Sequence, residues 1–540
     1  MRRWRGAAPL FAVVAASSLV LTACGDDGGD DGGKGKTGGS FTAAINEPDN
    51  LTPGFTTSSY SSTVINALFD PLTELTPQGK VKMLDAQSVE SKDQKTWTIK
   101  LRKGSKFSNG EAVTADSYVN AWNNAAYGPS GASANYYFAN IEGYDELNPE
   151  EEDAKPKAKT LSGLKVIDKQ TFEVTLKDPF SDFPLTLATP FAFSPLPKEA
   201  LSNPKGFKES PIGNGPFQMD GKWEHNKQIK VKKVKGYTGT RKPKVDGIEF
   251  RVYTSDDTQT NDVLSGGLDI GTVPANKVKS TKQQVGDRLQ TIPAGTMDYL
   301  GFPLFEKKYQ SADLRKAISM SIDREGIVKA VYDNGFKAMK SLTPPIVPGY
   351  QADACGEFCE YNPKKAKALL KKAGGFEGTM TLYFSNADPT YEKWMRIVAQ
   401  SLKDNLGITA KFKKVPDSDY LTTLNEQKED GPYRNNWVMD YPSAENYLAS
   451  MWGVGNRMGW KGKAFKDFNT KISEAKSAGS DSERLAKYAE AQKIAIDEMP
   501  MAPLWNWQNF TISSDKLANV PIDSYAYDGN GVRIEDVTVK

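Results

Sequence analysis

The chain has 540 residues, and its 69 Lys and Arg residues are almost balanced by 67 Asp and Glu residues. The net charge of +2 provides no field that would attract nucleic acid, so no nucleic-acid partner is expected. A hydrophobic content of 38% is typical of a globular body, and the length suffices for about two or three domains with a large core.

The first 23 residues have the three-part layout of a secretion signal. Arginines open the chain, a mostly apolar run covers residues 7–21, and small residues lead into Cys24. Because this apolar run is short for a membrane-spanning helix, residues 1–23 are predicted to be a signal peptide. A slightly short transmembrane anchor is the alternative.

The tetrapeptide LTAC (21–24) resembles the lipobox of bacterial lipoproteins. In those proteins the cysteine thiol receives a diacylglyceryl group, and the chain is cut just before it. Two acyl chains hold a protein stably on a membrane, whereas one chain holds it only marginally. Residues 24–40 are mainly Gly, Asp, Lys and Ser, so they cannot bury enough apolar surface to offset the entropy of ordering. We therefore expect a flexible leash that ties an extracellular body to the membrane through diacylglyceryl Cys24.

Two further cysteines, Cys355 and Cys359, lie in the segment ADACGEFCEY. In an exported protein such a pair predicts a short-loop disulfide, and two free thiols are the alternative. A metal site would need more ligands, and the chain has a single histidine, His225. Neither a metal nor a cofactor is expected.

Strand and helix patterns alternate along the first half of the body. Residues 96–102 place Trp97, Ile99 and Leu101 on one face, as a half-buried strand does. A helix follows, with Thr114 as its N-cap. Further strands are predicted at 171–177, 228–234 and 247–253, and a proline-rich crossing lies at 179–197.

Longer helices are predicted in the second half. Residues 311–335 predict two consecutive helices, with Ser311 and Asp323 as N-caps and Gly335 as the stop. Further helices are predicted at 362–375, 391–407 and 482–499, and strands at 379–385 and 408–415. This β-α-β alternation predicts an α/β lobe.

Four segments resemble the large oligopeptide- and dipeptide-binding family, family 5, of the solute-binding lipoproteins that serve bacterial ABC importers. They are WTIKLRKGSKFSNGEAVTADSYVNAW (97–122), IGNGPFQMD (212–220), ADLRKAISMSIDREGIV (312–328) and NPKKAKALLKKAGG (362–375). One such segment alone would be a weak signal, but four in the same order are a specific one. The resemblance covers about residues 40 to 535.

The resemblance implies an α/β fold of the class II periplasmic-binding-protein type, a two-lobed clam with an inserted α+β subdomain. The implied parts are lobe I (41–75, 190–292 and 505–540), the inserted subdomain (76–189) and lobe II (293–504). The lobes would be linked by two crossings, near TIPAGTMDYLGF and MAPLWNW.

The segment RNNWVMDY, which ends at Tyr441, resembles a pattern of peptide-binding relatives. The resemblance places Asp440 on the ligand's α-amino group and Arg434 on a ligand carboxylate, with Trp437 and Tyr441 beside them. The chemistry is suitable, because a buried ammonium needs a charged partner and a guanidinium has a planar fork that fits a carboxylate. Pro442 departs from the pattern and leaves the accepted peptide length open. The alternatives are that Asp440 caps a turn and that Trp437 fills the core.

Aromatic and hydroxyl residues elsewhere are further candidates for ligand contact. Tyr60 and Ser61 lie where the opposite lobe contacts the ligand in relatives, although they would also suit an ordinary helix start. Trp452, Trp505 and Trp507 are candidate pocket walls, because aromatic surface accepts many kinds of side chain. The same tryptophans would suit sugar stacking or the core.

The resemblance implies a monomer that captures oligopeptides between its lobes and delivers them to an ABC permease. That permease would have transmembrane subunits and a cytoplasmic ATPase. An oligosaccharide, a nickel chelate or another small solute is the alternative ligand, and a peptide-signal receptor is an alternative role. Asp440 favours a peptide, because an uncharged sugar has no ammonium. A secreted hydrolase is not expected, since its imidazole base could only be His225, which lies in a polar hairpin pattern.

Overall fold

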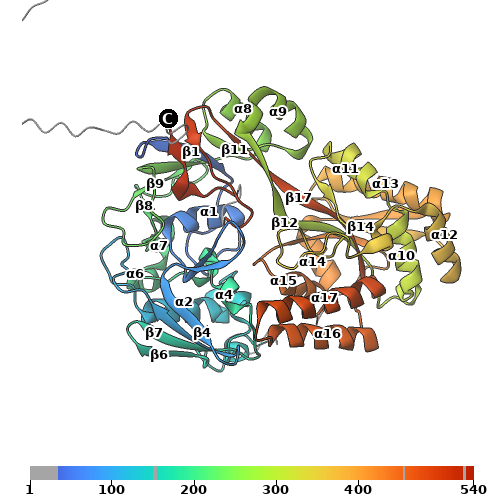
Figure 1. The fold of residues 1–540 in the computed structure, drawn as a ribbon, viewed down its shortest axis with the longest axis horizontal. Coiled ribbons are helices and arrows are strands. Elements are labelled where there is room, and N and C mark those ends of the chain that lie inside the picture. The colour runs from blue at the N-terminus through green and yellow to red at the C-terminus, as the bar shows by residue number, and fades with distance from the viewer. Residues whose placement is uncertain (1–34, 150–154, 454–455, 527–530) are drawn as a thin grey trace, which may run out of the picture.

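The computed structural model describes residues 35–149, 155–453, 456–526 and 531–540. The predicted signal peptide and Cys24 therefore lie outside the described residues. Figure 1 shows two bodies side by side, joined by the long strands β12 (Leu289–Gly301) and β17 (Met501–Ser513). Among the described residues, no helix has the length and apolar composition needed to span a bilayer.

A mixed sheet of eleven strands runs through both bodies. Its order is β15-β14-β16-β12-β17-β11-β1-β10-β9-β8, and β13 pairs with β17. The other strands are β1 (Ser40–Ile45), β8 (Phe217–Met219), β9 (Gln228–Lys233), β10 (Gly247–Val252), β11 (Ile270–Thr272), β13 (Lys337–Ala338), β14 (Met380–Ser385), β15 (Ala410–Val415) and β16 (Tyr433–Val438). β12 and β17 are antiparallel, with Leu289 opposite Ile512 and Gly301 opposite Met501, so this pair connects the two bodies.

The first lobe is built on the β1 end of the sheet. β1 pairs in parallel with β10, and β10 pairs antiparallel with β9. Phe41, Ile248 and Phe250 point from these strands into one buried core. The lobe also contains α1 (Ser59–Leu68), α6 (Lys198–Ser202), α7 (Pro204–Glu209), β18 (Leu517–Asn519) and β19 (Thr538–Val539). The last two strands pair with each other and return the end of the chain to this lobe.

An inserted subdomain has its own four-stranded antiparallel sheet, in the order β4-β5-β7-β6. Its strands are β4 (Ala86–Ser91), β5 (Thr96–Leu101), β6 (Leu164–Asp168) and β7 (Thr171–Thr175), preceded by the small pair β2 (Thr73–Leu75) and β3 (Val81–Met83). The helix α2 (Ala115–Ala126) packs on this sheet, with the fully buried Trp122 edge-on to Phe172. Thr114 forms a capping box with Ser117 at the start of α2, which confirms the predicted cap.

The second lobe has its own apolar core, which continues along the crossing strands to Val263 and Val285, and it carries the long helices. They are α10 (Ala312–Ser321), α11 (Arg324–Tyr332), α12 (Pro363–Lys372), α13 (Pro389–Leu406), α14 (Asp417–Asn425), α15 (Ala444–Trp452), α16 (Lys463–Lys476) and α17 (Asp481–Glu498). β14 and β15 are parallel neighbours in register, as the predicted β-α-β alternation requires. Near the crossing strands lie α8 (Asp256–Leu264) and α9 (Val278–Val285).

One sequence prediction of a helix end needs correction. The predicted stop at Gly335 is wrong, because α11 ends earlier and Asp333 adopts the left-handed conformation with φ 47°. Its backbone N–H then closes the last turn on the Val328 carbonyl. The proline-rich crossing contains the short helices α4 (Phe183–Thr186) and α5 (Pro190–Phe193), each with a proline in its first turn.

Candidate ligand-binding site

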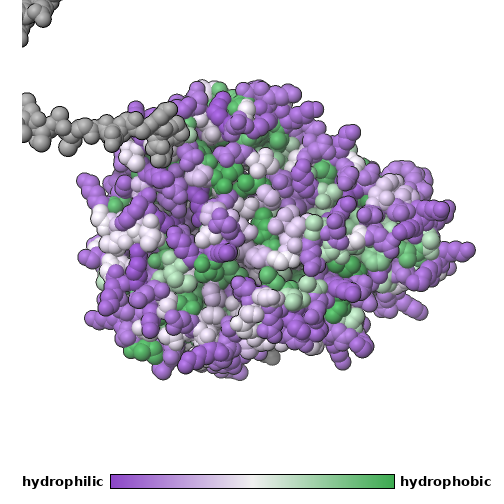
Figure 2. Space-filling view, in the orientation of Figure 1, coloured by the Kyte–Doolittle hydropathy of each residue, from purple (hydrophilic) through white to green (hydrophobic). Residues whose placement is uncertain are grey.

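A cavity of about 460 Å³ lies where the inserted subdomain meets the second lobe. Its volume falls in the range of about 300–1,000 Å³ that is common for small-ligand pockets. Figure 2 shows the surface hollowed between the two bodies, with hydrophobic residues along the hollow. The lining includes Tyr136, Tyr137, Asn140, Phe180 and Phe183 from the subdomain and Trp437, Asp440, Tyr441, Glu445 and Lys476 from the second lobe. We call it the Asp440 cavity.

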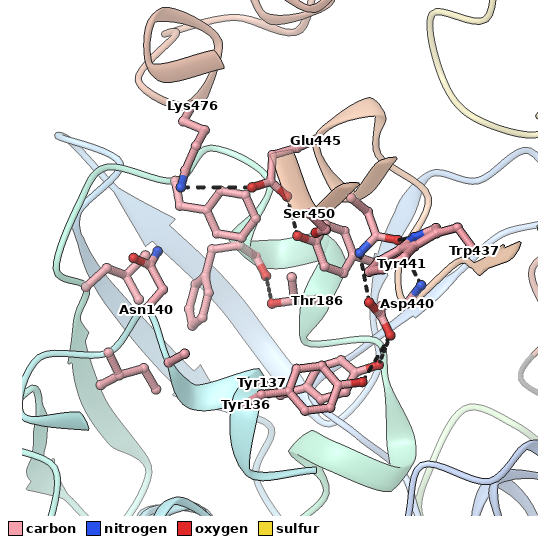
Figure 3. A pocket seen from close by; sticks show the side chains of 16 residues that line it. Tyr136, Tyr137, Asn140, Thr186, Trp437, Asp440, Tyr441, Glu445, Ser450 and Lys476 are labelled. Atoms are coloured by element: carbon pink, nitrogen blue, oxygen red, sulfur yellow. Dashed lines mark hydrogen bonds and ion pairs between the residues drawn. The ribbon is translucent and has the colours of Figure 1, made fainter. Parts of the chain in front are cut away.

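Asp440 is held at this boundary by hydrogen bonds from both sides (Figure 3). Its Oδ1 accepts hydrogen bonds from the hydroxyls of Tyr137 at 2.8 Å and Tyr136 at 3.2 Å. Its Oδ2 accepts one from the Nδ2 of Asn446 on α15 at 3.0 Å. The backbone N–H of Asp440 donates to the Oδ1 of the same asparagine at 3.0 Å. The carboxylate is therefore fixed in position by neutral groups.

The charge of Asp440 has no cationic partner in the described part of the chain, since the Lys, Arg and His nitrogens there lie beyond 4 Å of it. Burial and the neighbouring carboxylate raise the pKa of Tyr137 well above its ordinary value, so its hydroxyl stays protonated and donates. A carboxylate has about four acceptor positions, and three are used here. Asp440 can therefore accept a further donor that carries the missing positive charge.

Trp437 and Tyr441 form walls of the same cavity. The indole N–H of Trp437 donates to the Oδ1 of Asn446 at 3.0 Å, which fixes the ring. The hydroxyl of Tyr441 donates to Glu445, whose pKa is raised by burial. Lys476 reaches Glu445 with its Nζ at 3.9 Å. The structure thus places three residues predicted from one short segment, Trp437, Asp440 and Tyr441, around the same cavity.

Arg434 occupies a different place from the predicted one. Its Nε and Nη2 donate to the Oδ1 of Asp298 at 3.0 and 2.7 Å, and its guanidinium lies over the ring of Tyr391 at 3.7 Å. The residue is only 4% exposed and does not line the Asp440 cavity. The expected contact with a ligand carboxylate is therefore corrected to an internal ion pair. The alternation of β16 explains this, because Arg434 and Trp437 lie an odd number of residues apart and point to opposite faces.

Trp452 and Trp505 also belong to the core rather than to a cavity wall, since both are fully buried. The indole N–H of Trp505 donates to the Oδ2 of Asp298 at 2.8 Å, and its ring packs edge-on against Trp394. Their predicted role as walls is therefore corrected. Trp507 is less buried, and it stacks on Phe336 with the ring planes 12° apart.

A second cavity, of about 250 Å³, contains Tyr60, Asp256, Phe336 and Trp507 in its lining. Tyr60 is 38% exposed at the start of α1 and faces this space. Its neighbour Ser61 is fully buried and donates to the Oδ1 of Asp49 at 2.7 Å. Ser61 thus holds the loop before α1, and its predicted direct contact with a ligand is corrected to this structural bond.

Sequence reasoning missed Tyr136 and Tyr137, which lie in a 3-10 turn, Asn135–Phe138, of the inserted subdomain. They are 304 and 303 residues from Asp440 along the chain. A pair of adjacent tyrosines in a polar loop was the one available signal, and it could not indicate which carboxylate they meet.

The remaining predicted features lie outside these cavities. His225 follows β8 in a hairpin and bonds to Glu47 at 3.0 Å and Glu209 at 2.8 Å. The structure joins Cys355 to Cys359 by a disulfide. Within the described ranges, no group of three or more His, Cys, Asp or Glu side chains is placed to hold a metal ion.

Comparison with known proteins identifies one family. The family model for bacterial extracellular solute-binding proteins, family 5, matches residues 80–459. The chain is 27% identical over 531 residues to the dipeptide-binding protein DppE of Bacillus subtilis, covering 93% of this chain and 94% of that protein. It is equally 27% identical over 530 residues to the oligopeptide-binding protein OppA of the same organism, covering 93% and 94%.

The solved structure of the Escherichia coli murein tripeptide-binding protein MppA superposes with a TM-score of 0.73 at 22% identity, covering 94% of this chain and 99% of that one. This likeness confirms the predicted two-lobed α/β fold. Proteins of the matched family bind solutes for transport and are not enzymes, which confirms that prediction too. The chain belongs to the bacterial extracellular solute-binding proteins of family 5.

Proposed function

We propose that this protein captures short peptides in the Asp440 cavity and presents them to an ABC permease. The peptide's α-ammonium binds the carboxylate of Asp440, and Trp437 and Tyr441 contact the first side chain. The names of the two Bacillus subtilis relatives, dipeptide- and oligopeptide-binding, support this class of ligand.

One observation carries the proposal: Asp440 is a carboxylate positioned by neutral donors inside a cavity, and no Lys, Arg or His nitrogen of the described residues lies within 4 Å of it. Taking a charge out of water without a partner is unfavourable, so such a site favours a cationic group on the ligand. An ammonium also suits the two tyrosine hydroxyl oxygens, which can accept as well as donate. A neutral sugar would leave the charge of Asp440 unmatched.

We further propose a membrane anchor and domain boundaries for this protein. Cys24 carries a diacylglyceryl group, and residues 24–40 tether a monomeric body to the outer face of the cytoplasmic membrane. The first lobe comprises residues 41–75, 190–292 and 505–540, and the second lobe comprises residues 293–504. Residues 76–189 form the inserted subdomain of the first lobe. Cys24→Ser should abolish lipid labelling of the full chain in cells, and unchanged labelling would contradict the anchor.

The ligand proposal is tested by calorimetry with trialanine and its N-acetylated form. Asp440→Asn keeps the shape and removes the charge, so trialanine should bind more weakly by roughly a hundredfold to several thousandfold. N-acetylation of trialanine should weaken its binding to the wild type by a similar factor. The effects of the substitution and of the acetylation should not be additive, because both remove the same contact. Asp404→Asn, on the exposed face of α13, is the control and should bind trialanine like the wild type.

Equal binding of free and acetylated trialanine would contradict the proposal. Binding of an oligosaccharide without binding of any peptide would overturn the peptide assignment and favour the alternative ligand class. Neither result would alter the family or the fold.

A further inference from the structure

Basic side chains are concentrated in one stretch of the first lobe. Residues 226–245, which contain β9, include eight Lys and Arg residues and no Asp or Glu, although the whole chain has a net charge of only +2. In Figure 1, β8 and β9 lie on the side of the first lobe that faces away from the second lobe. This stretch therefore gives one end of the molecule a local positive charge that the net charge does not reveal.

Hydrogen bonds join this stretch to two other short segments. The Nη1 of Arg102, which follows β5, donates to the carbonyl of Thr238 at 3.1 Å, and the Oγ1 of Thr238 donates to the carbonyl of Gly104 at 3.2 Å. The backbone N–H of Gly38 donates to the carbonyl of Lys244 at 2.7 Å. The loop after β5, the segment after β9 and the residues that lead into β1 thus form one surface.

Six exposed lysines on these three segments have no acidic partner. No Asp or Glu oxygen of the described residues lies within 4 Å of their ammonium nitrogens, whereas Lys232 is bound to Asp220 at 2.7 Å and Lys244 to Asp536 at 3.2 Å. The six are Lys36, Lys103, Lys106, Lys233, Lys235 and Lys242. We call them the basic patch.

Neighbouring groups leave the charge of the basic patch in place. Asp70 is buried and bound to Arg241 at 2.7 Å, so it faces the interior. Asp246 is exposed, and one of its oxygens accepts a backbone N–H just before β1 at 3.0 Å. The ammonium groups of Lys233 and Lys242 donate to backbone carbonyls of their own segment at 2.9 and 2.6 Å. These carbonyls hold the two lysines at the surface without neutralising them.

We propose that the basic patch binds the anionic phospholipid headgroups of the membrane to which the chain is tethered. This inference rests on the proposed anchor, since the proposed tether, residues 24–40, leads into β1 beside the patch. Lysines close to an anionic lipid surface are attracted to it, and the attraction falls off within a Debye length. Bound through this end, the first lobe lies on the membrane, and the second lobe is left free to move and to take up peptide.

The test is co-sedimentation with vesicles of phosphatidylcholine and with vesicles in which part of it is replaced by phosphatidylglycerol. The chain begins at residue 24 and carries Cys24→Ser, so neither the signal peptide nor an acyl group contributes to binding. Residues 24–34 are kept, so that their four aspartates can compete with the lipid. Binding is expected only with phosphatidylglycerol. It should weaken between about 0.1 M and about 1 M NaCl, because the Debye length falls from about 10 Å to about 3 Å.

Removing charge from the basic patch should weaken this binding. Lys103→Gln, Lys106→Gln and Lys235→Gln, combined in one chain, should weaken it by about a hundredfold, since each lysine contributes roughly fivefold. Replacing the same three residues with arginine should preserve binding, because the charge stays in place.

The matched control removes the same charge from the second lobe. Lys364, Lys367 and Lys371 are exposed on α12, and no acidic oxygen of the described residues lies within 4 Å of their ammonium nitrogens. Their combined replacement by glutamine should leave vesicle binding as it is in the starting chain. Both triple variants should bind trialanine like the wild type, which shows that they are folded.

The inference is overturned if the chain binds neutral and mixed vesicles equally, or binds neither. It is also overturned if the two glutamine variants lose binding equally, because the attraction then depends on net charge and not on the patch. Binding to a soluble poly(glycerol phosphate) but not to vesicles would overturn the membrane assignment in favour of a wall polymer. Lipid labelling at Cys24 and peptide binding at Asp440 are measured separately, so none of these results decides the proposed function.

Discussion

Asp298 is a buried carboxylate whose two oxygens are fully used inside the second lobe. Its Oδ1 accepts both hydrogen bonds from Arg434, and its Oδ2 accepts the indole N–H groups of Trp505 at 2.8 Å and Trp507 at 2.6 Å. The aspartate is 1% exposed. Because Asp298 lies on β12 and Trp505 and Trp507 on β17, this cluster joins the side chains of the two crossing strands.

Asp298→Ala should therefore destabilise the protein strongly. It would leave the guanidinium of Arg434 buried without its counter-ion, and breaking a buried pair typically costs about 3–5 kcal/mol. Urea unfolding followed by circular dichroism measures the change in the free energy of unfolding. Asp404→Ala, at an exposed position of α13, is the control and should leave it nearly unchanged. A similar decrease in the free energy of unfolding in the two variants would show that the Asp298 cluster does not stabilise the lobe.

His225 should titrate above the ordinary pKa of a histidine. The hydrogen bond with Glu209 is the main cause of the raised pKa, and that with Glu47 adds to it. A raised folded-state pKa stabilises the fold at pH values below the unfolded-state pKa, and this contribution is lost as the pH rises through the folded-state value. Since the chain has one histidine, its ring resonances in proton NMR are unambiguous once any tag is removed.

Glu209→Gln should lower the titration midpoint of His225 toward the ordinary value. Glu224→Gln is the matched control, because the Glu224 side chain bonds to Lys227 and Gln228 and not to the imidazole. A midpoint that is unchanged by Glu209→Gln would assign the raised pKa to another cause.

At the candidate site, sequence reasoning could find only what lies close together along the chain. Asp440, Trp437 and Tyr441 come from one short segment, and all three line the same cavity. The partner of Arg434 is 136 residues away, so its burial in an ion pair has no local signal. The tyrosines that bind Asp440 come from a different lobe. They are also far from Asp440 along the chain, so no local pattern predicts this contact.

At the scale of single elements, local capping chemistry is readable from the sequence. Ser311 and Asp323 accept the backbone N–H groups of Leu314 and Gly326, as predicted for the starts of α10 and α11. The order of the strands is not readable in this way. β1 pairs with β10, and β12 with β17, across 200 residues or more, and each register depends on the packing of both partners.

The contact between the inserted subdomain and α15 and α17 depends on Asp182, which precedes α4. In Figure 1, α4, α15 and α17 lie below the crossing strands. The buried Asp182 Oδ2 accepts hydrogen bonds from Ser443 at 2.6 Å and Tyr488 at 2.9 Å, and its Oδ1 is 3.1 Å from the Nε of Arg484. One carboxylate thus joins groups from both sides of this boundary.

Asp182→Asn should loosen this boundary, because an amide has one acceptor oxygen in place of two and no charge to attract Arg484. Hydrogen–deuterium exchange should become faster in peptides that cover α4 and the start of α15, and stay unchanged in α12. Asp145→Asn, an exposed partner of Lys177 in the same subdomain, is the control. Unchanged exchange across the boundary in Asp182→Asn would show that apolar packing alone holds the two parts together.

For the whole molecule, the crossing strands provide a defined place for bending. The register of β12 on β17 shifts between Pro293 and Met297, and the extra residues form an irregular step in an otherwise regular pair. Asn506 fills this step, with its Nδ2 donating to the carbonyls of Ala294 at 2.7 Å and Thr296 at 2.9 Å. The core of the second lobe continues past this step to Leu289 and Ile512. We expect the lobes to rotate at the step because the regular ladder between the two strands is interrupted there.

Peptide binding should therefore make the molecule more compact. A ligand held by Asp440 contacts the second lobe directly and the inserted subdomain through Tyr136 and Tyr137, and it favours the lobe arrangement in which both sides meet it. Small-angle X-ray scattering should give a smaller radius of gyration with saturating trialanine than without it. Asp440→Asn at the same peptide concentration should keep the ligand-free value, because its binding is weakened. Identical scattering of the wild type with and without a peptide that calorimetry shows to be bound would mean that the cavity is preformed and that the step in β12 serves only the fold.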